Sequence, residues 1–106
     1  MTDITELKRA LVARVLDTNG MAAKELRRAA FDNTGLDDPI GTLTEKVVFH
    51  SDTVTDEDVA AVRAAGLSED QIFEIVVCAA IGQANRQYEG ALAALAAATG
   101  QTGDRR

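Results

Sequence analysis

The sequence predicts an all-α fold, a five-helix bundle in a single domain, and three observations point to it. Alanine is abundant, aromatic residues make up 4% of the chain and proline occurs once, a composition that favours helices over sheets. Apolar residues recur three and four positions apart in successive segments, the spacing of one helix face. Residues that start and stop helices separate these segments. We therefore expect one helical domain over residues 1–99 and a flexible tail over residues 100–106.

The first two helices are expected over residues 3–18 and 21–33. Asn19-Gly20 is a typical stop for the first helix, and the run NTG over residues 33–35 is a typical stop for the second. The apolar positions at helical spacing are Ile4, Leu7, Leu11, Val12, Val15 and Leu16 in the first helix, and Met21, Leu26, Ala29 and Ala30 in the second.

The third and fourth helices have recognisable starts and stops. The run GLDDP over residues 35–39 forms a loop whose last residues suit the first turn of the third helix, which ends near His50. The Thr55 hydroxyl can accept a hydrogen bond from the first turn of the fourth helix. Gly66 is expected to close that helix in the left-handed conformation. The inward residues are expected to be Ile40, Leu43, Val47, Val48, Val59 and Val62.

The fifth helix is expected to be long and buried. Ser68 opens it, and Gln71 three residues later completes a capping box. The run IFEIVVCAAI over residues 72–81 is apolar on nearly every side, which is typical of a helix buried on more than one face. Gly82 and Gly90 lie eight residues apart and would let another helix approach closely. An apolar stripe resumes at Tyr88, Leu92 and Leu95.

Charge and composition exclude several classes of function. The net charge is −6 and no long basic run occurs, so nucleic acid is not an expected partner. A single cysteine allows no disulfide within the chain. No signal peptide and no apolar run of membrane-spanning length are present, so we expect a cytoplasmic protein without a membrane partner. No phosphate loop, dinucleotide fingerprint or metal-ligand cluster occurs, so no cofactor or metal is expected.

His50 is the only imidazole and the first candidate for chemistry. Four carboxylates follow it within eight residues, and such a set could bind a divalent metal or support a general base. The same carboxylates lie where the N-terminus of the fourth helix favours negative charge, which is the structural interpretation. They belong to Asp52, Asp56, Glu57 and Asp58.

Three further candidates lie on the fifth helix. Cys78 could be a nucleophile, but its apolar neighbours predict a packed core thiol. Glu74 and Arg86 interrupt the apolar pattern, and buried ionisable groups can mark sites. They are twelve residues apart, too far to pair, so each is expected to reach another helix, another subunit or solvent. Asn85 and Arg86 are candidates for clamping the end of a neighbouring helix.

Residues 56–95 resemble the second half of the carboxymuconolactone decarboxylase and alkylhydroperoxidase-D-like family. That family has a helix ending in Ala-Ala-Gly, a capping segment of the type L-S-x-E-E-I-x-E, and a long alanine-rich helix with a polar Asn-Arg patch. The residues that carry the resemblance here are Ala64, Ala65 and Gly66, then Leu67 to Ile72 with Glu74, and finally Asn85 and Arg86.

The chain departs from the family at its redox centre. The peroxidases of the family carry a C-x-x-C-x-x-x-H motif, and counting back from Gly66 places Ser51 and Val54 at the two cysteine positions and Asp58 at the histidine position. Serine and valine cannot replace a low-pKa thiolate and its resolving thiol. Decarboxylase-type members keep a histidine, but His50 is out of register. The resemblance therefore implies the family architecture without thiol peroxidase chemistry.

The resemblance also implies assembly, because members of this family associate as trimers or hexamers. Our leading hypothesis is a redox-inactive, homo-oligomeric binding or assembly module that could hold a small apolar ligand between its helices. One alternative is a decarboxylase or isomerase acting on a small lactone or keto acid, with His50 as base and Arg86 holding a carboxylate. Another is a peroxidase that depends on Cys78 and a partner thiol.

Overall fold

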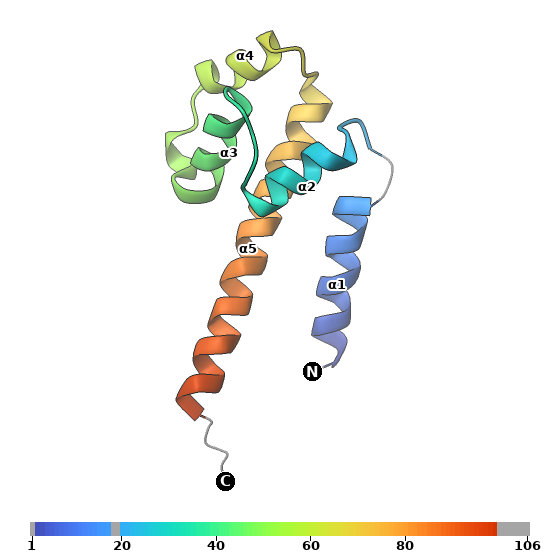
Figure 1. Cartoon of the computed structure of the whole chain (residues 1–106), viewed down its shortest axis with the longest axis vertical. Coiled ribbons are helices and arrows are strands. Elements are labelled where there is room, and N and C mark those ends of the chain that lie inside the picture. The colour runs from blue at the N-terminus through green and yellow to red at the C-terminus, as the bar shows by residue number, and fades with distance from the viewer. Residues whose placement is uncertain (1, 18–19, 100–106) are drawn as a thin grey trace.

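The computed structural model describes the chain over residues 2–17 and 20–99, and the side chains over residues 6–16 and 20–99. This described part contains helices and no strand, so the predicted all-α class is confirmed (Figure 1). The predicted flexible tail over residues 100–106 lies outside it. The elements in order are α1 (Thr2–Asp17), α2 (Lys24–Asp32), α3 (Ile40–Phe49), a short 3-10 turn η1 (Ser51–Thr53), α4 (Asp56–Ala64) and α5 (Glu69–Thr99).

Helix α5 is the axis on which the other helices pack. Its first half contacts α2 most extensively, and α3 and α4 gather at the same end of the molecule (Figure 1). The predicted close approach occurs at Gly82, where a Cβ atom would lie 1.9 Å from the carbonyl oxygen of Phe31 at the end of α2. A Cβ atom at Gly90 would have no neighbour within 4 Å, so only one of the two glycines serves packing within the described part of the chain.

Two apolar clusters form the core, and α5 contributes to both. The first joins α1, α2, α3 and α5, and the second joins α3, α4 and α5. Because the alanine-rich α5 offers small side chains, the larger residues of its neighbours can lie close to its axis. The buried residues of the first cluster are Leu16, Ala22, Ala30, Phe31, Val48, Ile75, Cys78 and Ala79, and those of the second are Leu43, Val62 and Ile72.

The predicted helix starts and stops around α4 and α5 are confirmed. The Thr55 hydroxyl accepts a hydrogen bond from the Asp58 amide, and the Asp58 carboxylate accepts one from the Thr55 amide. Ser68 and Gln71 make the same reciprocal pair at the start of α5. Gly66 has a φ of 111°, a conformation that side-chain-bearing residues rarely adopt.

The first two helices differ from the predicted pattern in two respects. Helix α2 begins at Lys24, three residues later than expected, because the amides of Met21 and Ala22 bind a side chain of α5 instead of continuing a helix. In α1, Leu7 and Leu11 are 70% and 48% exposed, although their spacing placed them on the predicted core face. Among the side chains of α1 that the structure describes, those that pack against the core belong to the last part of the helix.

The predicted burial of α5 is right for its first half and wrong for its second. With 31 residues, α5 is about 46 Å long, whereas a compact domain of this length is only about 33 Å across. The helix therefore extends past its partners (Figure 1). Every residue from Glu89 to Thr99 is exposed. None of the helices in the described part combines the length and apolarity of a membrane span.

Candidate functional site

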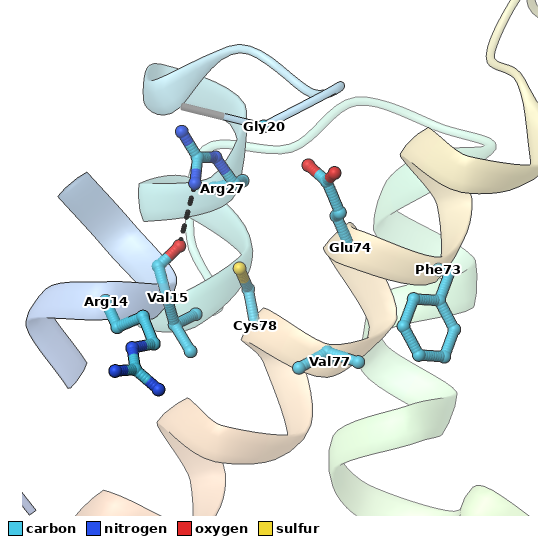
Figure 2. Close-up of a pocket in the computed structure, with 8 residues that line it drawn as sticks. All are labelled: Arg14, Val15, Gly20, Arg27, Phe73, Glu74, Val77 and Cys78. Atoms are coloured by element: carbon cyan, nitrogen blue, oxygen red, sulfur yellow. Dashed lines mark hydrogen bonds between the residues drawn. The ribbon is translucent and has the colours of Figure 1, made fainter. Parts of the chain in front are cut away.

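A cavity of about 200 Å³ lies between α1, the turn that precedes α2, and the first half of α5 (Figure 2). Charged side chains from three elements meet apolar ones here, which makes it the natural place to look for chemistry in this chain. Its lining residues are Arg14, Val15, Gly20, Arg27, Phe73, Glu74, Val77 and Cys78.

Arg27 is buried, with only 4% of its surface exposed, and its role is to cap α1. Its Nη1 atom donates a hydrogen bond to the carbonyl oxygen of Val15 at 2.9 Å, the dashed line in Figure 2. Val15 lies in the last turn of α1, where carbonyl groups lack donors from their own helix. The positive guanidinium also complements the negative end of that helix. Arg27 therefore holds the end of α1 against α2.

Glu74 performs the matching task at the start of α2. Its carboxylate oxygens accept hydrogen bonds from the amides of Met21 and Ala22 at 2.8 and 2.9 Å. These two bonds, Ala22 first, lower the pKa of the Glu74 carboxyl below its ordinary value, and the nearby charge of Arg27 acts in the same direction. Glu74 is therefore ionised at neutral pH and is engaged by backbone donors.

Arg86 holds the other end of α2, as the sequence predicted for a clamping residue. Its Nη1 atom donates to the carbonyl oxygen of Phe31 at 2.6 Å, and its Nη2 atom donates to Gln83 at 3.1 Å. A carboxylate of α5 thus meets the start of α2 while a guanidinium of α5 meets its end. Both charges have the sign that the helix dipole of α2 favours.

Cys78 lines the cavity floor and is 1% exposed. Burial is the main cause that raises the pKa of its thiol, opposed by the charge of Arg27 and reinforced by that of Glu74. A thiol in this state is protonated at neutral pH and is a poor nucleophile. The structure therefore agrees with the predicted packed core thiol.

His50 lies away from these residues, as the exposed residue that follows the last turn of α3. Its carbonyl oxygen accepts hydrogen bonds from the amide and the hydroxyl of Thr53. Neither His50 nor Arg86 lines the cavity that contains Glu74. The three candidates for chemistry are thus not brought together there. The described residues also contain no group of three or more His, Cys, Asp or Glu side chains that could hold a metal ion.

A second feature lies where α1 runs beside the middle of α5. Lys8 donates to the side chains of Asn85 and Glu89 at 3.0 and 2.6 Å, and its ammonium lies 5.1 Å from the centre of the Tyr88 ring. The bond from Lys8 is also the main cause that lowers the pKa of the Glu89 carboxyl. Lys8 therefore ties α1 to α5 at one point.

An apolar groove of about 240 Å³ adjoins the contact of Lys8 with α5. Leu11 and Tyr88 line the groove, so the apolar stripes of α1 and α5 meet in it. Leu7 lies one turn from Leu11 on α1, and Leu92 and Leu95 continue the stripe of Tyr88 along α5. We refer to these five residues, Leu7, Leu11, Tyr88, Leu92 and Leu95, as the α1–α5 face. Its four leucines are 46–70% exposed.

The sequence missed Arg14 and Arg27 as lining residues of the cavity. A signal for Arg27 exists, because it lies three and four residues before the buried Ala30 and Phe31 and so shares their helix face. Its neighbour Arg28 points away and pairs with Asp32.

Comparisons with known proteins do not identify the chain. No family model matches it, no curated protein matches its sequence, and no solved structure matches its fold. The resemblance of residues 56–95 to the alkylhydroperoxidase-D-like family therefore stays a prediction.

Proposed function

We propose that this protein is a helical self-association module in which copies of the chain pair through the α1–α5 face. One observation carries the proposal. The residues from Gly90 to Thr99 form about three turns of α5, all of them exposed, and contain no charged side chain. An exposed helix of a soluble monomer normally carries charges on its solvent side, so an uncharged exposed segment marks an interaction surface.

A second copy fits this surface better than an unrelated partner does. The stripe of Tyr88, Leu92 and Leu95 has the alternating four- and three-residue spacing with which helices pair. Two copies related by a twofold axis would place this stripe against itself or against the α1 part of the same face. The chain carries a net charge of −6, so copies repel one another over most of their surface. An uncharged segment is where two such copies can meet.

The exposed leucines of α5 allow an estimate of the free energy of association. Leu92 and Leu95 are 46% and 60% exposed, so completing their burial is worth about 1 kcal/mol for each side chain. Four such side chains in a dimer contribute about 4 kcal/mol, which corresponds to roughly a thousandfold change in the dissociation constant.

The enzymatic alternatives lack a comparable observation. His50 follows the end of α3, whereas Arg86 lies on α5 and donates a hydrogen bond to the end of α2. Cys78 is buried. A redox-inactive, alkylhydroperoxidase-D-like assembly module is compatible with the proposal, and the trimer or hexamer implied by that resemblance is one form that the association could take.

Light scattering coupled to size-exclusion chromatography tests the proposal. The wild-type chain should give a multiple of 11.2 kDa, with a population that grows with concentration and with added salt. The double variant Leu92→Glu, Leu95→Glu should give 11.2 kDa with an unchanged helical circular dichroism spectrum. The double variant Ala94→Glu, Ala97→Glu is the matched control, since it adds the same two charges at the same spacing to the side of α5 away from the stripe and should still associate.

Two results would refute the proposal. The first is a wild-type mass that stays at 11.2 kDa at every accessible concentration. The second is association of the double variant that equals that of the wild-type chain, because the stripe of α5 would then play no part.

A further inference from the structure

We propose that two copies of the chain pair with their α5 helices antiparallel, so that Leu95 of each copy fills the apolar groove between α1 and α5 of the other. This pairing rests on the self-association proposed above and specifies its geometry. The groove is the receiving half of the interface, and the exposed end of α5 is the inserting half. Within one chain, both halves are left uncovered.

The groove and the exposed end of α5 lie on one side of that helix. Successive residues of an α-helix are turned by about 100°. Five residues of α5 therefore fall within about 40° of a single line along the helix, and we refer to them as the α5 seam: Ile81, Ala84, Tyr88, Leu92 and Leu95. The first three line the groove, and the last two are exposed beyond it. The α5 seam therefore runs without a break from the groove into the exposed segment.

The sizes of the side chains in the α5 seam favour an antiparallel pair. Ala84 is the smallest and lies in the groove, whereas Leu95 is 60% exposed and is the last large side chain of the helix. If the partner's Leu95 lies over Ala84, the partner's Leu92 lies over Tyr88, because each of these steps is about one helical turn. A twofold axis repeats both contacts. Parallel pairing would set Leu95 on Leu95 and Ala84 on Ala84, which leaves the groove empty.

Helix α1 supplies the other wall of the groove, where Leu11 is 48% exposed. Because α1 runs antiparallel to α5 (Figure 1), Leu7 lies one turn beyond Leu11 toward the C-terminal end of α5. In the antiparallel pair, the partner's Leu95 meets Leu11 and the partner's Leu92 meets Leu7. All parts of the α1–α5 face are then covered by the same second copy.

The distribution of charge favours the same orientation. Residues 35–76 carry ten carboxylates and two basic side chains, a net charge of −8, whereas the rest of the chain is net +2. These residues form α3, η1, α4 and the start of α5, which gather at one end of the molecule (Figure 1). The antiparallel pair keeps the two acidic ends about 40 Å apart along α5, about four Debye lengths at 0.1 M salt. Parallel pairing places them side by side, where they repel.

Exchanging the sizes of two facing side chains tests the pairing, with the dissociation constant measured by sedimentation equilibrium. Ala84→Leu adds apolar surface, yet it should weaken association at least about tenfold because it fills the groove. Leu95→Ala should weaken association by a similar factor because it leaves the groove unfilled. The double variant Ala84→Leu, Leu95→Ala should return to within about threefold of the wild-type constant. Ala97→Leu makes the same substitution on the opposite side of α5 and should leave the constant unchanged.

Cross-linking reports the orientation directly. In the Cys78→Ala background, one chain carries Ala84→Cys and another carries Leu95→Cys. Each chain alone and an equal mixture of the two are treated with a short bis-maleimide reagent, which tolerates more geometries than a disulfide does. The antiparallel pair gives the mixed product from the mixture and little product from either chain alone. A parallel pair gives product from each chain alone.

The results distinguish a failure of this pairing from a failure of self-association. A wild-type mass of 11.2 kDa at every concentration would overturn both. If the wild-type chain associates, three results would each overturn the antiparallel pairing alone: cross-linking of the single-cysteine chains by themselves without a mixed product, association that Ala84→Leu does not weaken, or a double variant that associates no better than the two single variants.

Discussion

Gly82 and Gly90 form a matched pair for testing how α2 and α5 pack. Both lie inside the same helix, eight residues apart, and both can be replaced by alanine. At Gly82, the added Cβ would lie 1.9 Å from the carbonyl oxygen and 2.7 Å from the carbonyl carbon of Phe31. At Gly90, no atom lies within 4 Å. The substitution is chemically identical at the two sites, so any difference in its effect comes from the packing.

The expected effects have opposite signs. Real Cβ atoms essentially never come within 3.0 Å of such an atom, so Gly82→Ala must separate α2 from α5 by about 1 Å. Overpacking of this kind costs about 1–3 kcal/mol. The same movement of α2 weakens the 2.6 Å hydrogen bond from Arg86 to the carbonyl oxygen of Phe31, and its complete loss would cost about 1.5–3 kcal/mol. The higher helix propensity of alanine offsets about 1 kcal/mol of this loss in the free energy of unfolding. We expect Gly82→Ala to lower the free energy of unfolding by about 2–4 kcal/mol.

Gly90→Ala brings the same gain in helix propensity, and its Cβ atom contacts no other atom. It should raise the free energy of unfolding by about 0.5–1 kcal/mol. Urea denaturation followed by circular dichroism measures both changes, and thermal melts should show a loss of about 8–20 °C for Gly82→Ala. The Leu92→Glu, Leu95→Glu background keeps association from contributing. If Gly82→Ala is as stabilising as Gly90→Ala, the backbone contact between α2 and α5 does not exist and the packing described above is wrong.

Two further predictions concern the cavity residues. Because the pKa of Glu74 is lowered on folding, its contribution to stability is complete above its ordinary pKa of 4.5 and is lost as the pH falls through the folded value. Glu74→Gln should therefore be less stable than the wild-type chain at pH 7 and should lose less stability on acidification. A Glu45→Gln control on α3 should keep the wild-type dependence of stability on pH. The same dependence for Glu74→Gln would contradict the role of Glu74 at the start of α2. The Cys78 thiol should react with a thiol-specific disulfide reagent slowly in the native chain and rapidly in urea, because it is buried only in the folded state. A control chain with Cys78→Ala and Ala60→Cys carries an exposed thiol and should react rapidly under both conditions. Fast labelling of Cys78 in the native chain would show that this residue is not buried.

The local signals in the sequence predicted the start and the end of α4 and the start of α5. Thr55, Gly66, Ser68 and Gln71 act through hydrogen bonds and backbone conformations that span four residues or fewer. Such interactions depend little on the rest of the fold, so the sequence specifies them directly. The all-α class follows from the same signals together with the apolar spacing.

The apolar spacing did not reveal which residues are covered. Leu11 and Val15 occupy equivalent positions in the pattern of α1, yet Leu11 is 48% exposed while Val15 packs against the first cluster. The difference arises because α2 and the first half of α5 reach only the last part of α1. The same reasoning explains why the apolar run of α5 is buried and its later stripe is exposed.

The sequence by itself determined that this chain is helical, where α4 begins and ends, where α5 begins, and that its single cysteine has apolar neighbours. The tertiary structure alone decided that Glu74 and Arg86 hold the two ends of α2, that Arg27 is buried at the end of α1, and that the second half of α5 is left uncovered. These are contacts between residues up to 55 positions apart. They depend on how the helices are placed in space, and periodicity within a helix carries no information about its neighbours.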